Sequence, residues 1–176
     1  MSPRVAVCFL VINKMDVLPQ LAITSAFDRT NAEILIGFLD DSDLPILRKD
    51  IHIHKLQLEN PEDLGLRRLG SGYSDFSEDN FYKIVQLKWQ LLEKALELGF
   101  DYIIYSDTDV YWNLNPISEI VQVFNARKQI SIQIQSFTDL PSQPKLCMGF
   151  VALRNSVISK NFLTECRLRH TIYSET

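Results

Sequence analysis

The chain is poor in cysteine and has no excess of positive charge, and each of these features argues against certain classes of protein. Only Cys8, Cys147 and Cys166 occur among its 176 residues. They are too few and too scattered for a disulfide framework or for the closely spaced ligand pairs of a zinc site, which favours a reducing compartment. The formal net charge of −4 speaks against nucleic acid as a partner, because a phosphate backbone is bound by a basic face.

Long hydrophobic runs are also lacking. The apolar run at residues 5–12 is too short to cross a membrane, and no small-residue cleavage site follows it. We therefore expect no integral membrane segment and a cytoplasmic protein, or a Golgi-type lumenal one if the chain is an excised domain. The length and the 46% hydrophobic content predict a single domain over residues 1–176 with a substantial core.

Short apolar runs alternate with amphipathic stretches along the chain. Continuous or alternating apolar residues predict strands, and apolar residues at helical spacing predict helices. The expected strands are 5–12, 33–39, 51–56, 102–106, 130–134 and 147–153; the expected helices begin at Leu18 and cover 81–98, 117–124 and 156–167, and residues 59–80 are expected to form a long loop. This alternation predicts an α/β fold with a mostly parallel central sheet flanked by helices on both faces.

Two carboxylates, Asp107 and Asp109, directly follow the expected strand 102–106. This strand is a short continuous apolar run, which is typical of a strand buried on both faces. Ligands of open α/β sheets bind outside the carboxyl ends of the strands, where these aspartates fall. In extended chain their side chains would point to the same side, and hard oxygen ligands suit Mg²⁺ or Mn²⁺. The alternative is an acidic turn that merely ends the strand.

Two other groups of side chains leave alternatives open. His52 and His54 alternate with apolar residues, so they form either a metal-binding pair or the exposed face of an edge strand. Arg67 and Arg68 in the long loop either reach a phosphate or belong to a solvated surface.

Two longer segments resemble a known family. The likeness covers residues 81–116 and 147–165. Residues 81–116 read FYKIVQLKWQLLEKALELGFDYIIYSDTDVYWNLNP, and the second segment begins CMGFVALRNS at residues 147–156. In order they carry a helix with lysines, a D-x-D motif, an aromatic pair, Asn-Pro and a strand with a glycine. This combination resembles the nucleotide-diphospho-sugar transferases of GT-A fold. The resemblance implies a GT-A-like, Rossmann-like domain and a metal-dependent glycosyltransferase. Its donor would be a nucleotide sugar of UDP, its ion Mn²⁺ (or Mg²⁺), and its acceptor an unknown carbohydrate, protein or lipid.

The resemblance also assigns residues, and its metal ligands would be Asp107 and Asp109. Lysine on the preceding helix would contact the donor phosphates or the carboxylates of the site. The expected donor-binding residues are Lys83, Lys88, Asn13, Asp40, Ser106 and Thr108, and the expected sugar or acceptor pocket comprises Trp112, Met148 and Gly149. No catalytic base or nucleophile can be assigned from the sequence.

The chain departs from the family pattern in two places. Cys147 stands where relatives carry an asparagine two residues before the strand glycine, and relatives continue beyond the last helix. The C-terminus is therefore expected to be short. Two alternatives follow: a non-catalytic or truncated nucleotide-sugar-binding domain, and a D-x-D phosphatase with Asp107 as nucleophile. The phosphatase fold, however, places its D-x-D after the first strand.

Overall fold

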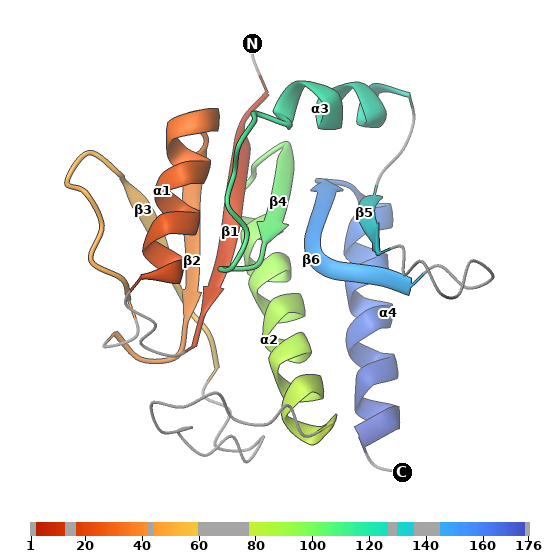
Figure 1. Cartoon of the computed structure of the whole chain (residues 1–176). Coiled ribbons are helices and arrows are strands. Elements are labelled where there is room, and N and C mark those ends of the chain that lie inside the picture. Colours follow the sequence, from red (N-terminus) through yellow and green to blue (C-terminus); the bar gives the residue numbers. More distant parts are fainter. Residues whose placement is uncertain are drawn as a thin grey trace.

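A single six-stranded sheet with helices on both faces forms the protein in this computed structural model (Figure 1). The structure describes residues 3–12, 17–41, 44–59, 78–126, 130–135 and 145–174. The strands are β1 (Val5–Val11), β2 (Glu33–Phe38), β3 (Ile53–Gln57), β4 (Tyr102–Ser106), β5 (Ile130–Gln135) and β6 (Lys145–Arg154). The helices are α1 (Leu18–Thr30), α2 (Glu78–Glu97), α3 (Ile117–Asn125) and α4 (Val157–Ser174).

The strand order across the sheet is β3-β2-β1-β4-β6-β5. Neighbours from β3 to β4 run parallel, whereas β6 runs antiparallel to both β4 and β5. β2, which follows β1 in the chain, pairs with one side of β1, and β4 pairs with its other side. The direction in which strands are added to the sheet therefore reverses between β1 and β4. Such a switch point is where open α/β sheets bind their ligands. The prediction of a mostly parallel sheet is confirmed.

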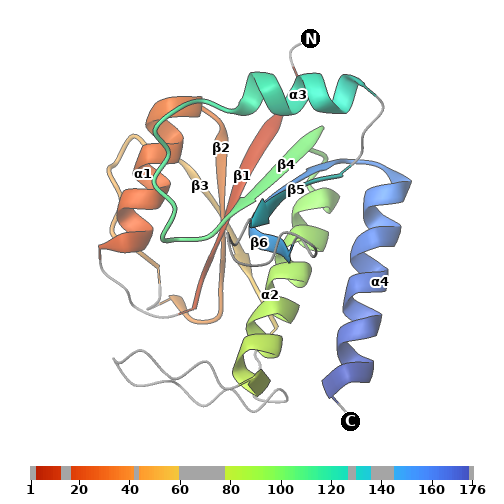
Figure 2. The ribbon, with the colours of Figure 1, turned by 45° about the vertical axis from the view of Figure 1, so that its right-hand side comes forward.

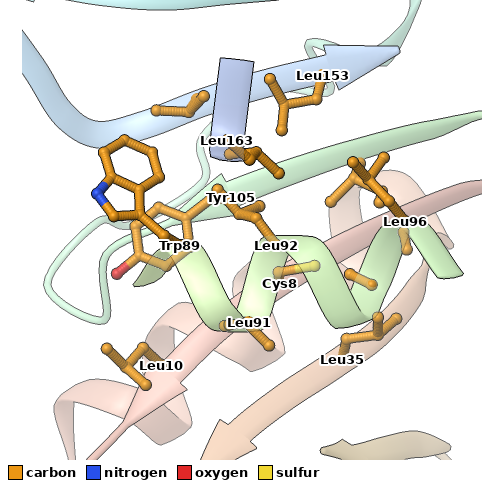
Figure 3. Packing of buried hydrophobic residues seen from close by; sticks show 14 of the residues in the cluster. Cys8, Leu10, Leu35, Trp89, Leu91, Leu92, Leu96, Tyr105, Leu153 and Leu163 are labelled. Carbon is orange, nitrogen blue, oxygen red and sulfur yellow. The ribbon is translucent and has the colours of Figure 1, made fainter. Parts of the chain in front are cut away.

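The central strand β1 contributes to two separate cores, one on each face of the sheet. Cys8 and Leu10 pack beneath α2 and α4, and Phe9 and Val11 pack beneath α1 and α3. Successive side chains of a strand point to opposite faces, so a strand of uniformly apolar residues must be covered on both sides. Figure 2 shows the helices in these two layers, and Figure 3 shows the packing of the first core.

The predicted strand 102–106 is observed with those limits, and all of its residues are buried. The prediction for α2 was less accurate. This helix runs from Glu78 to Glu97, whereas residues 81–98 were expected. Leu98, the last residue of the expected helix, is 42% exposed because the helix ends before Gly99, whose φ of 76° reverses the chain. Most of the expected long loop lies outside the described residues.

A side-chain amide joins the end of α2 to the start of β4. The Asn155 amide nitrogen donates to the carbonyl oxygens of both Leu96 and Phe100, at 2.9 Å each. The backbone N–H of Asn155 also donates to the carbonyl of Asp101 at 2.9 Å. The bond to Leu96 satisfies one of the carbonyl groups that the end of a helix leaves unpaired.

The segment after the aspartates is anchored on α1 by a buried serine. The backbone N–H of Trp112 donates to Ser25 Oγ at 3.0 Å, and that hydroxyl donates to the carbonyl of Ala22 at 2.9 Å. Ser25 and Trp112 are both buried. The chain that leaves β4 is thereby held against α1 on its way to α3 (Figure 2). Where the chain is described, every helix is too short or too polar to cross a lipid bilayer.

We predict that Ser25→Ala lowers the free energy of unfolding by about 1–3 kcal/mol, because it leaves the buried N–H of Trp112 without an acceptor. Urea unfolding followed by circular dichroism measures the change. Ser118→Ala is the control, since the Ser118 hydroxyl is exposed on α3 and bonds only to the neighbouring Glu119 among the contacts described. That control should change stability by less than about 0.5 kcal/mol. Equal losses in the two variants would contradict the anchoring role of Ser25.

Candidate functional site

Asp107 and Asp109 lie in a turn that begins where β4 ends. The N–H of Val110 donates to the carbonyl of Asp107 at 3.3 Å, which closes the turn. The expectation of an extended chain at the two aspartates is therefore wrong, because β4 stops at Ser106 and a turn follows. The side chain of Asp107 is 34% exposed, and Asp109 is exposed. Both carboxylates remain accessible at the carboxyl end of β4.

Asp107 is fixed in place by three elements of the fold. Its Oδ1 accepts a hydrogen bond from Lys88 Nζ of α2 at 2.7 Å and another from the Tyr105 hydroxyl of β4 at 2.7 Å. Its backbone N–H donates to the carbonyl of Gly149 in β6 at 2.8 Å. Charge-assisted hydrogen bonds of this length are the strong ones. The orientation of the carboxylate is thus determined before any ligand arrives.

Lys88 occupies a largely enclosed position between α2 and the sheet. Its side chain is 12% exposed, and its Nζ lies 5.0 Å from the centre of the Tyr105 ring. Of the two lysines expected to face the site, Lys88 therefore bonds to an aspartate of the D-x-D motif. The side chain of Lys83 lies outside the described residues.

Tyr105 is the main site residue that the sequence reasoning missed. Its ring belongs to the core beneath α2 (Figure 3). Its hydroxyl donates a hydrogen bond to Asp107. Burial first, and then the negative charge of Asp107, raises the pKa of the Tyr105 hydroxyl well above its usual value. The hydroxyl is therefore a permanent donor at neutral pH. The spacing of two residues between Tyr105 and Asp107 was the available signal.

Ser106 and Trp112 support the site from inside the fold. Ser106 has no exposed surface, and its hydroxyl accepts from Trp112 Nε1 and donates to the carbonyl of Asp107, both at 3.2 Å. Trp112 is 4% exposed and packs against Phe150. These contacts give the two side chains a structural role within the fold.

The other expected residues are spread over the same edge of the sheet or are not described. Thr108 is half-buried in the turn, and Gly149 contributes its carbonyl to Asp107. Asp40 is exposed two residues beyond β2, on the edge where β1 and β4 also end. Asn13, Arg67 and Arg68 lie outside the described residues, as does the side chain of Met148.

In the part of the chain that the structure describes, the two histidines do not belong to a group of three or more possible metal ligands. His52 precedes β3 and is exposed, whereas His54 within β3 bonds through Nε2 to Glu33 at 2.8 Å. β3 is an edge strand of the sheet, as the second interpretation of this segment expected.

A divalent ion fits this site only if its substrate supplies part of the coordination shell. Within the described ranges, no three side chains of His, Cys, Asp or Glu converge as a metal centre. Asp107 and Asp109 offer two hard carboxylate ligands on one accessible turn. Mg²⁺ and similar ions are commonly held by one or two carboxylates together with substrate phosphates and water. The donor set is thus that of a shared site between the protein and a phosphate ligand.

Comparisons with known proteins place this geometry in context. A family model described as nucleotide-diphospho-sugar transferase matches residues 32–175. A search of curated proteins found no match. Among solved structures, the galactosyltransferase LgtC, crystallised with donor and acceptor sugar analogs, superposes with a TM-score of 0.57 at 12% sequence identity. The match covers 97% of this chain and 65% of that one, so this chain spans about two thirds of the length of LgtC. The fold is therefore of the GT-A type, as expected.

We predict that Tyr105→Phe destabilises the protein at neutral pH and that this deficit narrows above about pH 10. The variant loses the hydrogen bond to Asp107, which costs about 1–2 kcal/mol. Because the folded pKa of Tyr105 is raised, its contribution to stability is complete below the unfolded pKa of about 10. That contribution then falls by up to about 1.4 kcal/mol per pH unit.

Urea unfolding of both proteins between about pH 8 and about pH 11 measures the difference. Tyr111→Phe is the control, since Tyr111 is 57% exposed and its removal should leave the pH dependence unchanged. A stability difference between Tyr105→Phe and the unaltered protein that stays constant over this range would contradict the prediction.

Proposed function

Because the chain belongs to the nucleotide-diphospho-sugar transferase family, we propose that it is a metal-dependent glycosyltransferase. It would transfer a sugar from a nucleoside-diphosphate sugar, with UDP as the nucleotide, to a carbohydrate, protein or lipid acceptor. The observation that carries the proposal is the fixed carboxylate of Asp107 beside exposed Asp109, at the switch point between β1 and β4. Donor and acceptor sugar analogs bound to LgtC, a protein of similar fold, agree with this substrate class.

The proposed ligands of the ion are Asp107 and Asp109. Asp107 would use the oxygen that is not already bonded to Lys88 and Tyr105. Asp109, which is exposed, is free of the constraint of the strand and would reach the ion from the turn. A divalent ion bound here would supply Lewis-acid stabilisation of the leaving nucleoside diphosphate. Mn²⁺ and Mg²⁺ both suit these oxygen ligands.

The remaining residues would bind and orient the donor. Lys88 has three N–H donors and is close enough to Asp107 to reach an adjacent phosphate as well. Thr108 in the turn and Gly149 in β6 flank Asp107 and would lie beside the donor. Asp40, at the end of β2, is a candidate for the nucleoside on grounds of position alone. Asn13, Lys83 and Met148 remain candidates from the sequence.

A second candidate function is binding of a nucleotide sugar without turnover. It is favoured because no catalytic base or nucleophile could be assigned from the sequence. Mn²⁺-dependent hydrolysis or transfer from a UDP-sugar would support the transferase, and binding without turnover would support the second candidate. Release of phosphate from an aryl phosphate would instead indicate a D-x-D phosphatase.

The first experiment is a screen of nucleotide sugars for thermal stabilisation with and without Mn²⁺. A ligand that binds only the native state raises its stability by mass action. We expect UDP-sugars to raise the melting temperature when Mn²⁺ is present. If none of the nucleotide sugars raises the melting temperature, with or without Mn²⁺, the proposal is overturned.

We predict that Asp109→Asn abolishes Mn²⁺-dependent binding of UDP and leaves the fold intact. The amide keeps the size of the side chain but removes the charge that a divalent ion requires. Isothermal titration calorimetry of UDP in the presence of Mn²⁺ measures the loss. Glu97→Gln is the control, because Glu97 is an exposed acid at the far end of α2, before β4 begins. Unchanged UDP binding by Asp109→Asn would remove Asp109 from the metal site.

A further inference from the structure

The cation next to the D-x-D motif in this structure is an amino-acid side chain. Lys88 Nζ lies 2.7 Å from Asp107 Oδ1, and this bond joins residues 19 positions apart. The same oxygen also accepts from the neutral hydroxyl of Tyr105. Asp107 therefore has a full positive charge at contact distance without any metal ion.

The ammonium group of Lys88 is held where it is. Its side chain is 12% exposed and lies over the ring of Tyr105, which is itself buried. The neighbours of Lys88 on α2, Leu87 and Trp89, are both buried in the core. A lysine carried by such a helix cannot swing into solvent without giving up the Asp107 bond and exposing apolar surface. We expect Lys88 to stay beside Asp107 when other charges enter.

The charges of the site then favour one type of ligand over another. Asp107, Asp109 and Lys88 together leave a single net negative charge. This net charge attracts a divalent cation only weakly when the cation arrives alone. At close range the fixed ammonium group of Lys88 also repels the cation. A diphosphate changes the balance, because its negative groups attract both the ion and the ammonium group of Lys88, which has three N–H donors.

We propose that Lys88 makes binding of the divalent ion depend on the diphosphate of the nucleotide. Lys88 opposes the ion when it arrives alone and favours the ion and the diphosphate together, so it couples two ligands that share one site. This inference rests on the proposed function, because it assumes that a divalent ion and a nucleoside diphosphate bind at Asp107. The coupling is reciprocal: the ion strengthens binding of the diphosphate by the same factor as the diphosphate strengthens binding of the ion.

The test compares calorimetric titrations of Mn²⁺ alone, UDP alone and Mn²⁺ in saturating UDP. For the unaltered protein we expect UDP to strengthen Mn²⁺ binding by more than about tenfold. In Lys88→Met we expect tighter binding of Mn²⁺ alone, weaker binding of UDP, and a coupling factor about tenfold smaller. Lys88→Gln keeps a donor for Asp107 without the charge and should behave in the same way, which provides a second variant should the first fail to fold.

Lys94→Met is the matched control. Lys94 is on the same helix and its Nζ donates to the carbonyl of Gln57 at 2.9 Å, away from Asp107. Its removal should leave all three titrations unchanged. Far-UV circular dichroism and thermal unfolding establish that each variant is folded.

The possible failures can be told apart. If the unaltered protein binds UDP with Mn²⁺ and both Lys88 variants keep the same coupling factor, the role of Lys88 is overturned and the proposed function stands. Loss of binding in the Lys88 variants without any gain for Mn²⁺ alone also overturns it, since Lys88 would then only position Asp107. If the unaltered protein binds neither Mn²⁺ nor UDP, the proposed function itself fails.

Discussion

The carboxylate of Asp107 is the point on which the site depends, because three elements of the fold meet there. Its side chain bonds to Lys88 of α2 and Tyr105 of β4, and its backbone bonds to Gly149 of β6. The fold brings these groups to Asp107, because β4 and β6 are neighbours in the sheet and α2 packs on the face to which Tyr105 points. The core beneath α2 thereby sets the geometry of a charged group at the surface.

The local pattern of the sequence was sufficient for the central part of the fold. The strand that carries the D-x-D motif, the helix before it and the mostly parallel sheet were all predicted, because apolar periodicity reports directly which faces are buried. The limits of α2 were less accurate. The expected helix covered residues 81–98, whereas α2 runs from Glu78 to Glu97, and Leu98 is exposed where the chain reverses at Gly99.

The details of the site were harder to predict because they depend on contacts across the chain. Trp112, an aromatic residue beside an acidic turn, was expected in a sugar pocket. Its place in the core follows from Ser25 and Phe150, which are distant in sequence. The resemblance implied that a lysine of this helix contacts the donor phosphates or the carboxylates of the site, and the bond from Lys88 to Asp107 shows which lysine reaches the D-x-D motif. Sequence spacing shows which side of a helix a residue occupies, but not what a long side chain can reach.

The amide of Asn155 has a consequence for how the protein can move. By binding the carbonyls of Leu96 and Phe100, it joins the end of α2 to the beginning of β4. Lys88 and Asp107 therefore belong to one stiff hairpin of helix and strand, closed at one end by Asn155 and at the other by their own ion pair. We expect this hairpin to move as a rigid body. A closing motion around a substrate would have to come from segments outside it, which would approach a carboxylate that itself stays still.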